Sequence, residues 1–334
     1  MNTVNHQFKL ATRPVGAVKR SDFNYVEEAL REPQDGELLI KISHISLDPA
    51  MRGWMSDAKS YMPPVAIGET MRAIAIGQVV SSKNPLFAAG DTVTGILGVQ
   101  EYAISNGQGL NKVDARLAPL PLFLGALGMP GLTAYFGLLD IGLPKEGETV
   151  VVSGAAGAVG MLVGQIAKIK GCRVIGIAGG ADKCDYLVKE LGFDAAIDYK
   201  NGDVMAGLRE HAPKGVDVFF DNVGGDILDA VLANLARDAR IVICGGISQY
   251  NNTTAIKGPS NYLALISARA SMKGLMVGDY YHRAGPALQE MGGWIMQGKL
   301  KTREDVVEGL ETFPETFAKL FSGQNNGKLV LKVA

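Results

Sequence analysis

The sequence contains little cysteine and histidine, and neither sign of charge is in excess. Its 334 residues include three cysteines and four histidines, and no two cysteines form a Cys-x-x-Cys pair. Lysine and arginine number 33 against 34 aspartates and glutamates, which gives a formal net charge of −1. The composition therefore argues against a disulfide scaffold and a zinc lobe with paired cysteines. It also argues against nucleic acid or an anionic membrane as a partner, because either would require a basic surface.

The chain also lacks the apolar core of a signal peptide, because polar residues such as Asn5 and Lys9 separate its first apolar residues. One uncharged run of 19 residues, 149–167, meets the length requirement of a membrane span. Glycines interrupt this run, and its pattern changes midway from β-branched residues to a helical period. A buried strand that leads into a buried helix explains it better. We therefore predict a protein without a membrane partner, located in the cytoplasm.

The length predicts two domains, since a typical domain holds about 100–150 residues. The first part of the chain contains short strand-like segments separated by turns, at residues 37–42, 75–80 and 92–95. A proline-containing apolar stretch at 119–131 then marks a boundary. We predict a β-rich domain over residues 1–125, completed by residues 300–334, and a second domain over residues 126–299.

From residue 148 onward, strand-like and helix-like segments alternate. Strands are expected at residues 149–153, 173–178, 195–198, 216–221, 240–244 and 271–277. Helices are expected at residues 157–170, 182–191, 203–211, 227–235 and 284–297. This alternation predicts βαβ units and an α/β fold with a doubly wound parallel sheet of the Rossmann type. A last helix at 309–321 precedes a terminal strand at 327–332, which we expect to return to the β-rich domain.

The strongest local signal is a glycine-rich turn between the first of these strands and its helix. It consists of Val150-Val151-Val152-Ser153-Gly154-Ala155-Ala156-Gly157-Ala158-Val159-Gly160. Glycines at this spacing allow a tight turn, a close approach of the backbone to a pyrophosphate, and close packing of the helix on the strand. The helix N-terminus then offers N–H groups to the phosphates. Because further βαβ units follow, we predict a dinucleotide-binding turn; a turn that serves only packing is the alternative.

The end of the second strand indicates which dinucleotide is bound. NAD-binding proteins place an acidic residue there to bind the ribose 2′-hydroxyl, whereas this sequence has Gly179 and Gly180. Lys183 follows and could neutralise a 2′-phosphate, so NADPH is the predicted cofactor. The alternative for Lys183 is an ordinary solvated surface lysine. Asp182 is expected to cap the helix that begins here.

The residues that a catalytic metal or nucleophile would need are scattered. A catalytic zinc requires three protein ligands. Yet Cys172, Cys184 and Cys244 all lie in the nucleotide-binding half, and His44 is a lone histidine more typical of packing than of ligation. Ser153 lacks the Gly-x-Ser-x-Gly elbow of acyl transfer. A metal-free hydride transfer fits this inventory best.

Hydride addition to a conjugated carbonyl requires a hydrogen-bond donor where negative charge develops on the carbonyl oxygen. A tyrosine hydroxyl can donate there and can also relay a proton. Tyr250 follows the strand at 240–244, and ligands of open α/β sheets bind at the carboxyl ends of such strands. We predict a catalytic role for Tyr250; the alternative is a rim tyrosine whose hydroxyl bonds to the backbone.

Several further motifs are spread over nearly the whole chain. They are Leu47-Asp48-Pro49-Ala50-Met51-Arg52-Gly53, Ser60-Tyr61-Met62-Pro63-Pro64, Met129-Pro130-Gly131-Leu132-Thr133-Ala134-Tyr135, Asp221-Asn222-Val223-Gly224-Gly225 and Asn325-Asn326-Gly327-Lys328. Together with the glycine turn, they resemble the zinc-free medium-chain reductases, in particular the prostaglandin reductase and curcumin reductase branch. The resemblance implies a GroES-like β-rich domain joined to a Rossmann domain, and a homodimer. It also implies NADPH-dependent reduction of the carbon–carbon double bond of enones and enals, although some members oxidise a lipid hydroxyl.

The resemblance assigns cofactor and substrate residues by motif. The cofactor contacts that it implies are Gly157, Ala158, Val159, Gly160, Lys183, Tyr199, Asn222, Cys244, Gly245, Gly246, Ile247, Ser248, Gln249, Tyr250, Leu275, Met276, Val277, Asn325, Met129 and Thr133. Tyr61 and Tyr250 match tyrosines placed at the substrate in the curcumin-reducing branch, so we predict both as catalytic.

Some positions have more than one possible role, and others carry residues that differ from those of the family. Arg52 is either part of a buried structural ion pair or a substrate contact, and Ala50 stands where many relatives carry tyrosine. Gly68-Glu69-Thr70 stands where zinc-dependent cousins have Gly-His-Glu, which is consistent with metal-free chemistry. Tyr262 lies in a loop whose place no motif gives, and it could cap the substrate.

The predicted function is NADPH-dependent reduction of α,β-unsaturated ketones or aldehydes by hydride transfer to the β-carbon. The enolate oxygen would be held by Tyr250, by Tyr61 or by a ribose hydroxyl of the cofactor. One alternative is an NADPH-dependent quinone reductase with the same fold, so the predicted partner is a hydrophobic enone, enal or quinone. An alternative of another class is a redox sensor that binds NADPH without turnover.

Overall fold

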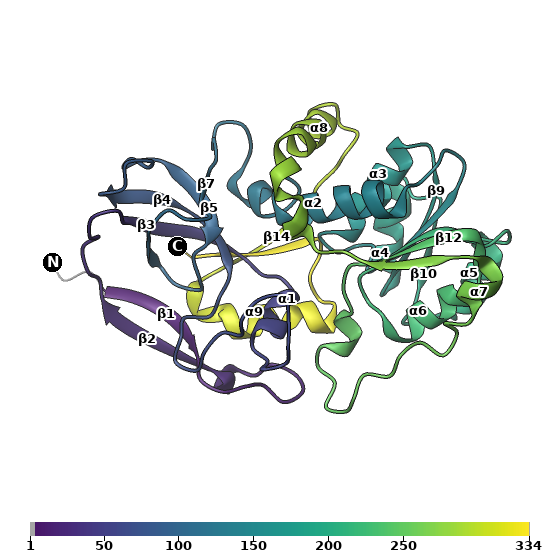
Figure 1. Ribbon diagram of the computed structural model, residues 1–334, viewed down its shortest axis with the longest axis horizontal. Helices are drawn as coiled ribbons and strands as arrows, with labels where there is room; N and C mark the ends of the chain where they lie inside the picture. The colour runs from purple at the N-terminus through teal and green to yellow at the C-terminus, as the bar shows by residue number, and fades with distance from the viewer. Residues whose placement is uncertain (1–3, 334) are drawn as a thin grey trace. The chain divides into compact units, whose positions relative to one another are not determined.

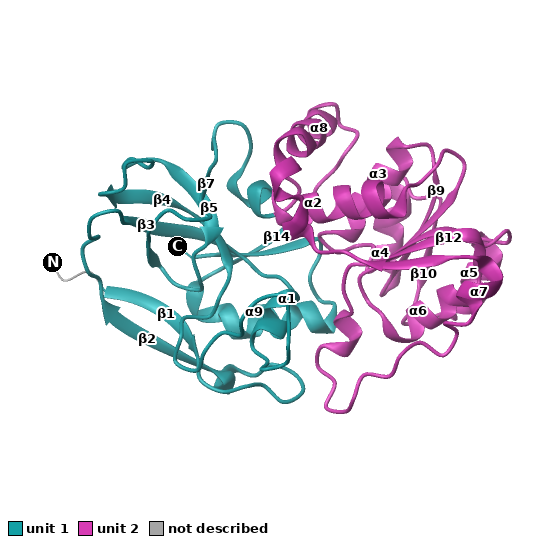
Figure 2. Ribbon diagram, in the orientation of Figure 1, with its two compact units in different colours: residues 1–124, 304–334 teal, residues 125–303 magenta. Residues whose placement is uncertain are grey.

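The computed structural model describes residues 4–333, and the chain divides into two compact units (Figures 1 and 2). The first unit comprises residues 1–124 and 304–334, and the second comprises residues 125–303.

The second unit is built on a six-stranded parallel sheet. Its strands, in spatial order, are β10 (Ala195–Asp198), β9 (Arg173–Ala178), β8 (Thr149–Ser153), β11 (Val216–Asp221), β12 (Leu235–Ile243) and β13 (Ser271–Gly274). β8 is central and is buried from Val150 to Ser153, which explains its continuous run of valines. The chain order along the sheet reverses between β8 and β11, and ligands of doubly wound sheets bind at such a switch point.

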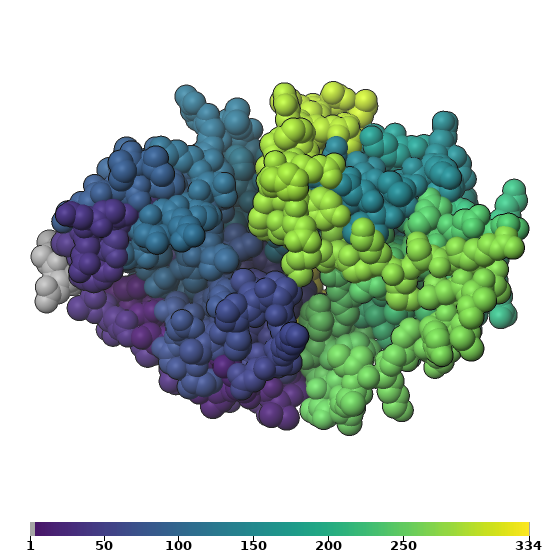
Figure 3. All heavy atoms as spheres, in the orientation of Figure 1, coloured from purple at the N-terminus to yellow at the C-terminus, as the bar shows by residue number. Residues whose placement is uncertain are grey.

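Helices cover both faces of this sheet (Figure 1). On one face lie α2 (Met129–Phe136), α3 (Gly160–Ile169), α4 (Ala181–Asp185) and α8 (Ala284–Met296). On the other face lie α5 (Val204–His211), α6 (Gly225–Leu232) and α7 (Ala264–Ala268). Two separate apolar clusters result, and Figure 3 shows α8, in yellow-green, at the surface of this unit. The predicted doubly wound parallel sheet is therefore confirmed.

Several local predictions for this unit need correction. The strand expected over 240–244 spans Leu235–Ile243, and the helix expected over 227–235 spans Gly225–Leu232. The helix expected from residue 157 begins at Gly160, because residues 154–159 form the turn. The strand expected over 271–277 ends at Gly274, and a 3-10 helix follows at Val277–Arg283. Asp182 does not cap α4: Gly180 occupies the cap position with φ +99°, so α4 begins one residue before Asp182. Asp182 then lies in the first turn, where a negative charge favours the helix dipole.

The first unit is rich in antiparallel strands. Its larger sheet has the order β14 (Glu304–Glu308), β15 (Lys328–Lys332), β3 (Leu38–Ser46), β4 (Ile74–Ser82), β5 (Thr92–Ile96) and β7 (Asn111–Lys112), with β6 (Tyr102–Ser105) also paired to β3. A second sheet pairs β1 (Val4–Leu10) with β2 (Phe23–Ala29), and the helices are α1 (Ala50–Trp54) and α9 (Phe313–Ser322). The terminal strand β15 pairs with β3, as expected, whereas β14 was not predicted.

A buried ion pair attaches β15 to this unit. Lys328 is 1% exposed, and its Nζ donates to the carbonyl oxygen of Leu47 at 2.9 Å and to Oδ1 of Asp48 at 2.7 Å. The paired residues are 280 positions apart in the sequence. The ammonium and the carboxylate therefore compensate one another where neither could be solvated.

The described part of the chain contains no helix that is long and apolar enough to cross a membrane. The uncharged run at 149–167 forms β8, the glycine turn and most of α3.

Candidate functional site

The glycine turn joins β8 to α3 at the carboxyl edge of the parallel sheet. Gly154 has a φ of +57°, which glycine adopts without a steric penalty. A Cβ at Gly160 would lie only 2.4 Å from the carbonyl oxygen of Gly154, and the N–H of Gly157 donates to that oxygen at 2.9 Å. Ala158 and Val159 complete the turn before α3 begins. The N–H groups of Met161, Leu162 and Val163 donate to carbonyl oxygens of the turn. The positive end of the α3 dipole faces the turn, so this end suits the phosphates of a dinucleotide.

A buried hydrogen-bond network joins this turn to the end of β11, across the switch point. Ser153 Oγ donates to Oδ1 of Asp221 at 2.7 Å, and the N–H of Asn222 donates to Ser153 Oγ at 2.8 Å. The side-chain Nδ2 of Asn222 donates to the carbonyl oxygen of Ser153 at 2.8 Å. Asp221 also accepts the N–H groups of Val223 and Gly224, and its burial raises the pKa of its carboxyl. The network fixes the predicted cofactor residue Asn222 relative to the glycine turn.

The end of β9 carries small residues that larger side chains cover. A Cβ at Gly179 would lie 2.9 Å from Tyr199 Oη and 2.9 Å from Cε of Lys200, so these two side chains lie over the glycine. Lys183 is half-buried in the following helix, α4. A hydroxyl and two ammonium groups in this region suit a 2′-phosphate, which carries negative charge and several acceptor oxygens.

The carboxylate of Asp198, close to this region, is already hydrogen-bonded to backbone. It accepts the N–H groups of Gly180 at 2.8 Å and of Lys200 at 3.0 Å. These bonds, the one from Gly180 first among them, hold the pKa of Asp198 below its usual range. Asp198 therefore fastens the turn after β9 and does not stand where an NAD-binding protein has its acidic residue.

The segment from Cys244 to Tyr250 follows β12 and runs along the loop after β11. The N–H groups of Cys244 and Gly245 both donate to the carbonyl oxygen of Asp221, at 2.9 and 3.1 Å. Ser248 Oγ donates to the carbonyl oxygen of Val223 at 2.6 Å. Burial raises the pKa of the Cys244 thiol to about 12, so the thiol stays protonated and is a poor nucleophile at neutral pH. In this segment, which also includes Gly246, Ile247 and Gln249, we therefore expect backbone groups to make most of the cofactor contacts.

Tyr250 is half-buried, and its hydroxyl folds back onto this segment. The N–H of Gly246 donates to Tyr250 Oη at 3.2 Å. A Cβ at Gly245 would lie 3.1 Å from the same oxygen, which explains a glycine there. This contact agrees with the backbone-bonded alternative for Tyr250, and it also leaves the hydroxyl proton directed to some other acceptor.

The remaining predicted cofactor residues of this unit lie on two elements. Leu275 donates its N–H to the last carbonyl of β12 at 2.9 Å, Met276 follows it, and Val277 begins the 3-10 helix. Met129 begins α2, and Thr133 is buried one turn later. Thr133 Oγ donates to the carbonyl oxygen of Met129 at 2.7 Å, so its proton is used within the helix.

Tyr61 and Asn325 belong to the first unit. Tyr61 is 57% exposed, and its Oη accepts a hydrogen bond from Nε1 of Trp54 at 2.9 Å. Asn325 stabilises the turn before β15, where its Nδ2 donates to the carbonyl oxygen of Gly327 at 3.0 Å.

The structure also places three other residues singled out in the sequence. Arg52 is buried and donates to the carbonyl oxygens of Pro14 and Gly16, which favours its structural role. Burial lowers the pKa of His44, so its ring is neutral near pH 7. Tyr262 lies exposed in the loop before α7.

Comparisons with known proteins agree with this arrangement. One family model, described as the N-terminal domain of oxidoreductase, matches residues 6–113, and another, described as zinc-binding dehydrogenase, matches residues 158–292. The NADPH-dependent curcumin reductase of Escherichia coli is 45% identical over 99% of this chain and 97% of its own length. The 2-alkenal reductase (NADP(+)-dependent) of Nicotiana tabacum is 42% identical over 99% of this chain and 98% of its own length. The crystal structure of CurA from Vibrio vulnificus in complex with NADPH has a TM-score of 0.94 at 45% identity, and covers 98% of this chain and 99% of that one.

The chain belongs to the medium-chain dehydrogenase/reductase family. This membership accounts for the paired architecture of a β-rich unit and a doubly wound unit. The second family model mentions zinc, but among residues 4–333 no three His, Cys, Asp or Glu side chains are grouped as metal ligands. Gly68-Glu69-Thr70 likewise contributes one carboxylate and no histidine.

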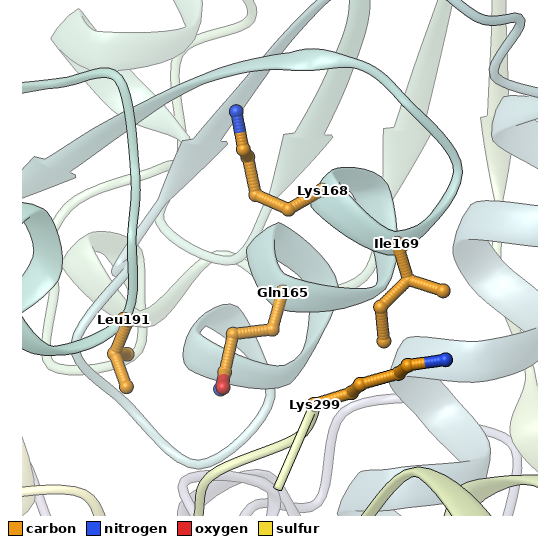
Figure 4. Close-up of a pocket in the computed structure, with 5 residues that line it drawn as sticks. All are labelled: Gln165, Lys168, Ile169, Leu191 and Lys299. Atoms are coloured by element: carbon orange, nitrogen blue, oxygen red, sulfur yellow. The ribbon is translucent and has the colours of Figure 1, made fainter. Parts of the chain in front are cut away.

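A surface cavity of about 310 Å³ in the second unit does not coincide with the region that medium-chain reductases would use (Figure 4). Its lining residues are Gln165, Lys168, Ile169, Leu191 and Lys299. Three of these lie in the second half of α3, which runs from the carboxyl edge of the sheet toward the amino edge. The nitrogen and the oxygen of the Gln165 side-chain amide are both already bonded to backbone, and the two lysines point in different directions. The glycine turn lies at the other end of α3.

Three residues of this family member were not predicted as site residues. Asp221 and Lys200 are neighbours of the predicted cofactor residues Asn222 and Tyr199, and nothing else in the sequence indicated them. Trp54 gave no signal, because a tryptophan at the end of a short helix is an ordinary core residue.

Proposed function

We propose that this chain is an NADPH-dependent reductase of α,β-unsaturated ketones and aldehydes. The proposal depends most on the glycine turn beside a strand end that has no acidic residue, in a chain similar over nearly its whole length to a curcumin reductase and a 2-alkenal reductase. Curcumin and 2-alkenals share a carbon–carbon double bond conjugated with a carbonyl group, and this shared group defines the substrate class.

The residues of the second unit fit the cofactor. Gly157, Ala158, Val159 and Gly160 would hold the pyrophosphate, and Lys183 and Tyr199 would hold the 2′-phosphate. The nicotinamide half would contact Asn222, the segment 244–250 and Leu275, Met276 and Val277. Met129 and Thr133 would add further contacts, as would Asn325 of the first unit. When bound, NADPH supplies the hydride that is added to the β-carbon of the substrate.

Tyrosine hydroxyls support the substrate side of the reaction. As the double bond is reduced, negative charge develops on the carbonyl oxygen, and an O–H donor there stabilises it. Tyr61 accepts an N–H from Trp54, so the proton of its hydroxyl is directed elsewhere and can be donated, whereas Tyr250 accepts the N–H of Gly246. A tyrosine or water then delivers a proton to the α-carbon.

Other parts of the proposal follow from the composition and the surface. We expect the reaction to proceed without metal, since Gly68-Glu69-Thr70 stands where zinc-dependent cousins have Gly-His-Glu. Residues 126–299 form the NADPH-binding domain, and residues 1–125, completed by residues 300–334, form the GroES-like catalytic domain. The protein acts in the cytoplasm, which agrees with three free cysteines. It forms a homodimer through the second unit, where β13 is an edge strand and Leu263 and Ile266 are largely exposed.

A substrate panel followed by loss of nicotinamide absorbance tests the function. We expect NADPH, and not NADH, to be consumed with 4-phenyl-3-buten-2-one and with 2-alkenals, and more slowly with naphthoquinones. Faster turnover of quinones would favour the quinone reductase. Binding of NADPH without turnover of any substrate would favour the sensor.

A conservative variant tests Tyr250 within the same assay. Tyr250→Phe should lower turnover at least about tenfold, the order that one positioned donor contributes, and should leave NADPH affinity unchanged. An unchanged rate would remove Tyr250 from the mechanism and leave Tyr61, the ribose hydroxyl or water as donor.

A further inference from the structure

Tyr61 has an anchor that none of its assigned roles explains. It stands in the loop after α1 and is 57% exposed, so its side chain would ordinarily be free to change rotamer. Its hydroxyl, however, lies 2.9 Å from Nε1 of Trp54, which is only 6% exposed. A buried indole therefore holds an exposed phenol.

The chemistry of the two groups determines the direction of this hydrogen bond. An indole N–H can only donate, so Tyr61 Oη must be the acceptor. The proton of the Tyr61 hydroxyl is then directed away from Trp54, and the part of the chain between residues 4 and 333 offers it no second partner.

We propose that Trp54 is a positioning residue, which holds the Tyr61 hydroxyl and directs its O–H to the carbonyl oxygen of the substrate. The proposal depends on the function proposed above, because it takes Tyr61 as a donor to that oxygen. Trp54 itself does not touch the substrate and acts through Tyr61.

The surroundings of Trp54 suit this task. Its carbonyl oxygen accepts the N–H of Val65 at 2.8 Å, which closes the loop that contains Tyr61. The guanidinium of Arg72 lies 5.9 Å from the centre of the indole ring and also donates to the carbonyl oxygen of Pro63 at 2.8 Å. Trp54 is thus fixed by its burial, its backbone and a cation–π contact, and the loop is fastened after Tyr61, at Pro63 and Val65.

The hydrogen bond can be observed without any turnover. The chain has two tryptophans, Trp54 and Trp294, so ¹⁵N-labelled indole groups give two side-chain NMR signals. Trp294→Phe assigns them. We expect Tyr61→Phe to shift the Trp54 indole signal and to leave the Trp294 signal in place. An unchanged Trp54 signal would overturn the proposal.

A ligand titration connects this contact to the substrate. The saturated ketone 4-phenyl-2-butanone, added in the presence of NADP⁺, should shift the Trp54 indole signal of the unaltered protein. The same addition should have no such effect on Tyr61→Phe. A ketone that binds without moving the Trp54 signal, or that moves it equally in both proteins, would show that the hydroxyl is not directed to the carbonyl.

A kinetic cycle separates positioning from simple packing. One net hydrogen bond corresponds to a factor of about five, so Trp54→Phe should lower kcat/KM for 4-phenyl-3-buten-2-one about fivefold and leave the NADPH Kd unchanged. The double variant should be no slower than Tyr61→Phe alone, because Trp54 acts only through that hydroxyl. An additional fivefold loss in the double variant would mean that Trp54 serves packing, and would refute the proposal.

These experiments can refute the role of Trp54 without refuting the proposed function, and the reverse. No consumption of NADPH by the unaltered protein would refute the proposed function, whereas the indole spectrum would still decide the Trp54–Tyr61 contact. If Trp54→Phe did not fold, the spectra of the unaltered protein and of Tyr61→Phe would decide the proposal, since both retain Trp54.

Discussion

Replacing Gly160 by alanine tests whether NADPH binding requires the close packing of α3 on the glycine turn. Within a helix, alanine is ordinarily favoured over glycine by about 1 kcal/mol. At this position the new Cβ would lie 2.4 Å from the carbonyl oxygen of Gly154 and 2.8 Å from Cα of Ala155. Both are backbone atoms, so the start of the helix must shift, and overpacking of this kind costs about 1–3 kcal/mol. We expect a net loss of up to about 2 kcal/mol in the free energy of unfolding, from the difference of these terms.

Gly293 in α8 provides a matched control, because a Cβ there would meet no atom within 4 Å. Thermal unfolding and fluorescence titration with NADPH measure both variants. Gly160→Ala should lower Tm by about 2–4 °C per kcal/mol lost and raise the NADPH Kd about tenfold or more, because the N–H groups of α3 move. Gly293→Ala should keep the Kd and equal or exceed the original Tm. If the two variants behaved alike, the argument from glycine spacing would be wrong.

Other predictions concern charge. Lys183→Ala should weaken NADPH binding about tenfold but spare NADH, since a charged hydrogen bond contributes about 1.5–3 kcal/mol; equal losses in parallel titrations would contradict the assignment. The hydrogen bond to Glu101 raises the pKa of His6 above 6.5, so its stabilisation is complete below that pH and is lost as the pH rises through the folded-state pKa. In denaturant titrations, His6→Gln should reduce this fall in the free energy of unfolding as the pH rises above 6.5. Lys328→Met would leave the buried Asp48 carboxylate without its cation, and should cost about 3–5 kcal/mol in the same titrations unless the carboxylate is removed too.

The alternation of elements in the second unit could be predicted from local pattern. β8, β9, β10 and β11 begin and end at the predicted residues, because each is a short apolar run bounded by turn residues. The ends of helices were less accurate, since Asp182 has the right residue type for a cap but Gly180 takes the position. β14 was missed because Glu304-Asp305-Val306-Val307-Glu308 has too much charge for a strand pattern, and only its pairing with β15 makes it one.

The sequence by itself determined the parallel sheet, the glycine turn and the absence of an acidic residue at the end of β9. Each of these depends on residues a few positions apart, whose steric and burial preferences act locally. Only the tertiary structure decided which side chains meet. Ser153 meets Asp221 and Asp48 meets Lys328 from distant parts of the sequence, and the path of a loop brings the Tyr61 hydroxyl to Trp54. Such pairs depend on strand order and loop path, and these are set by burial summed over the whole core, which no local pattern contains.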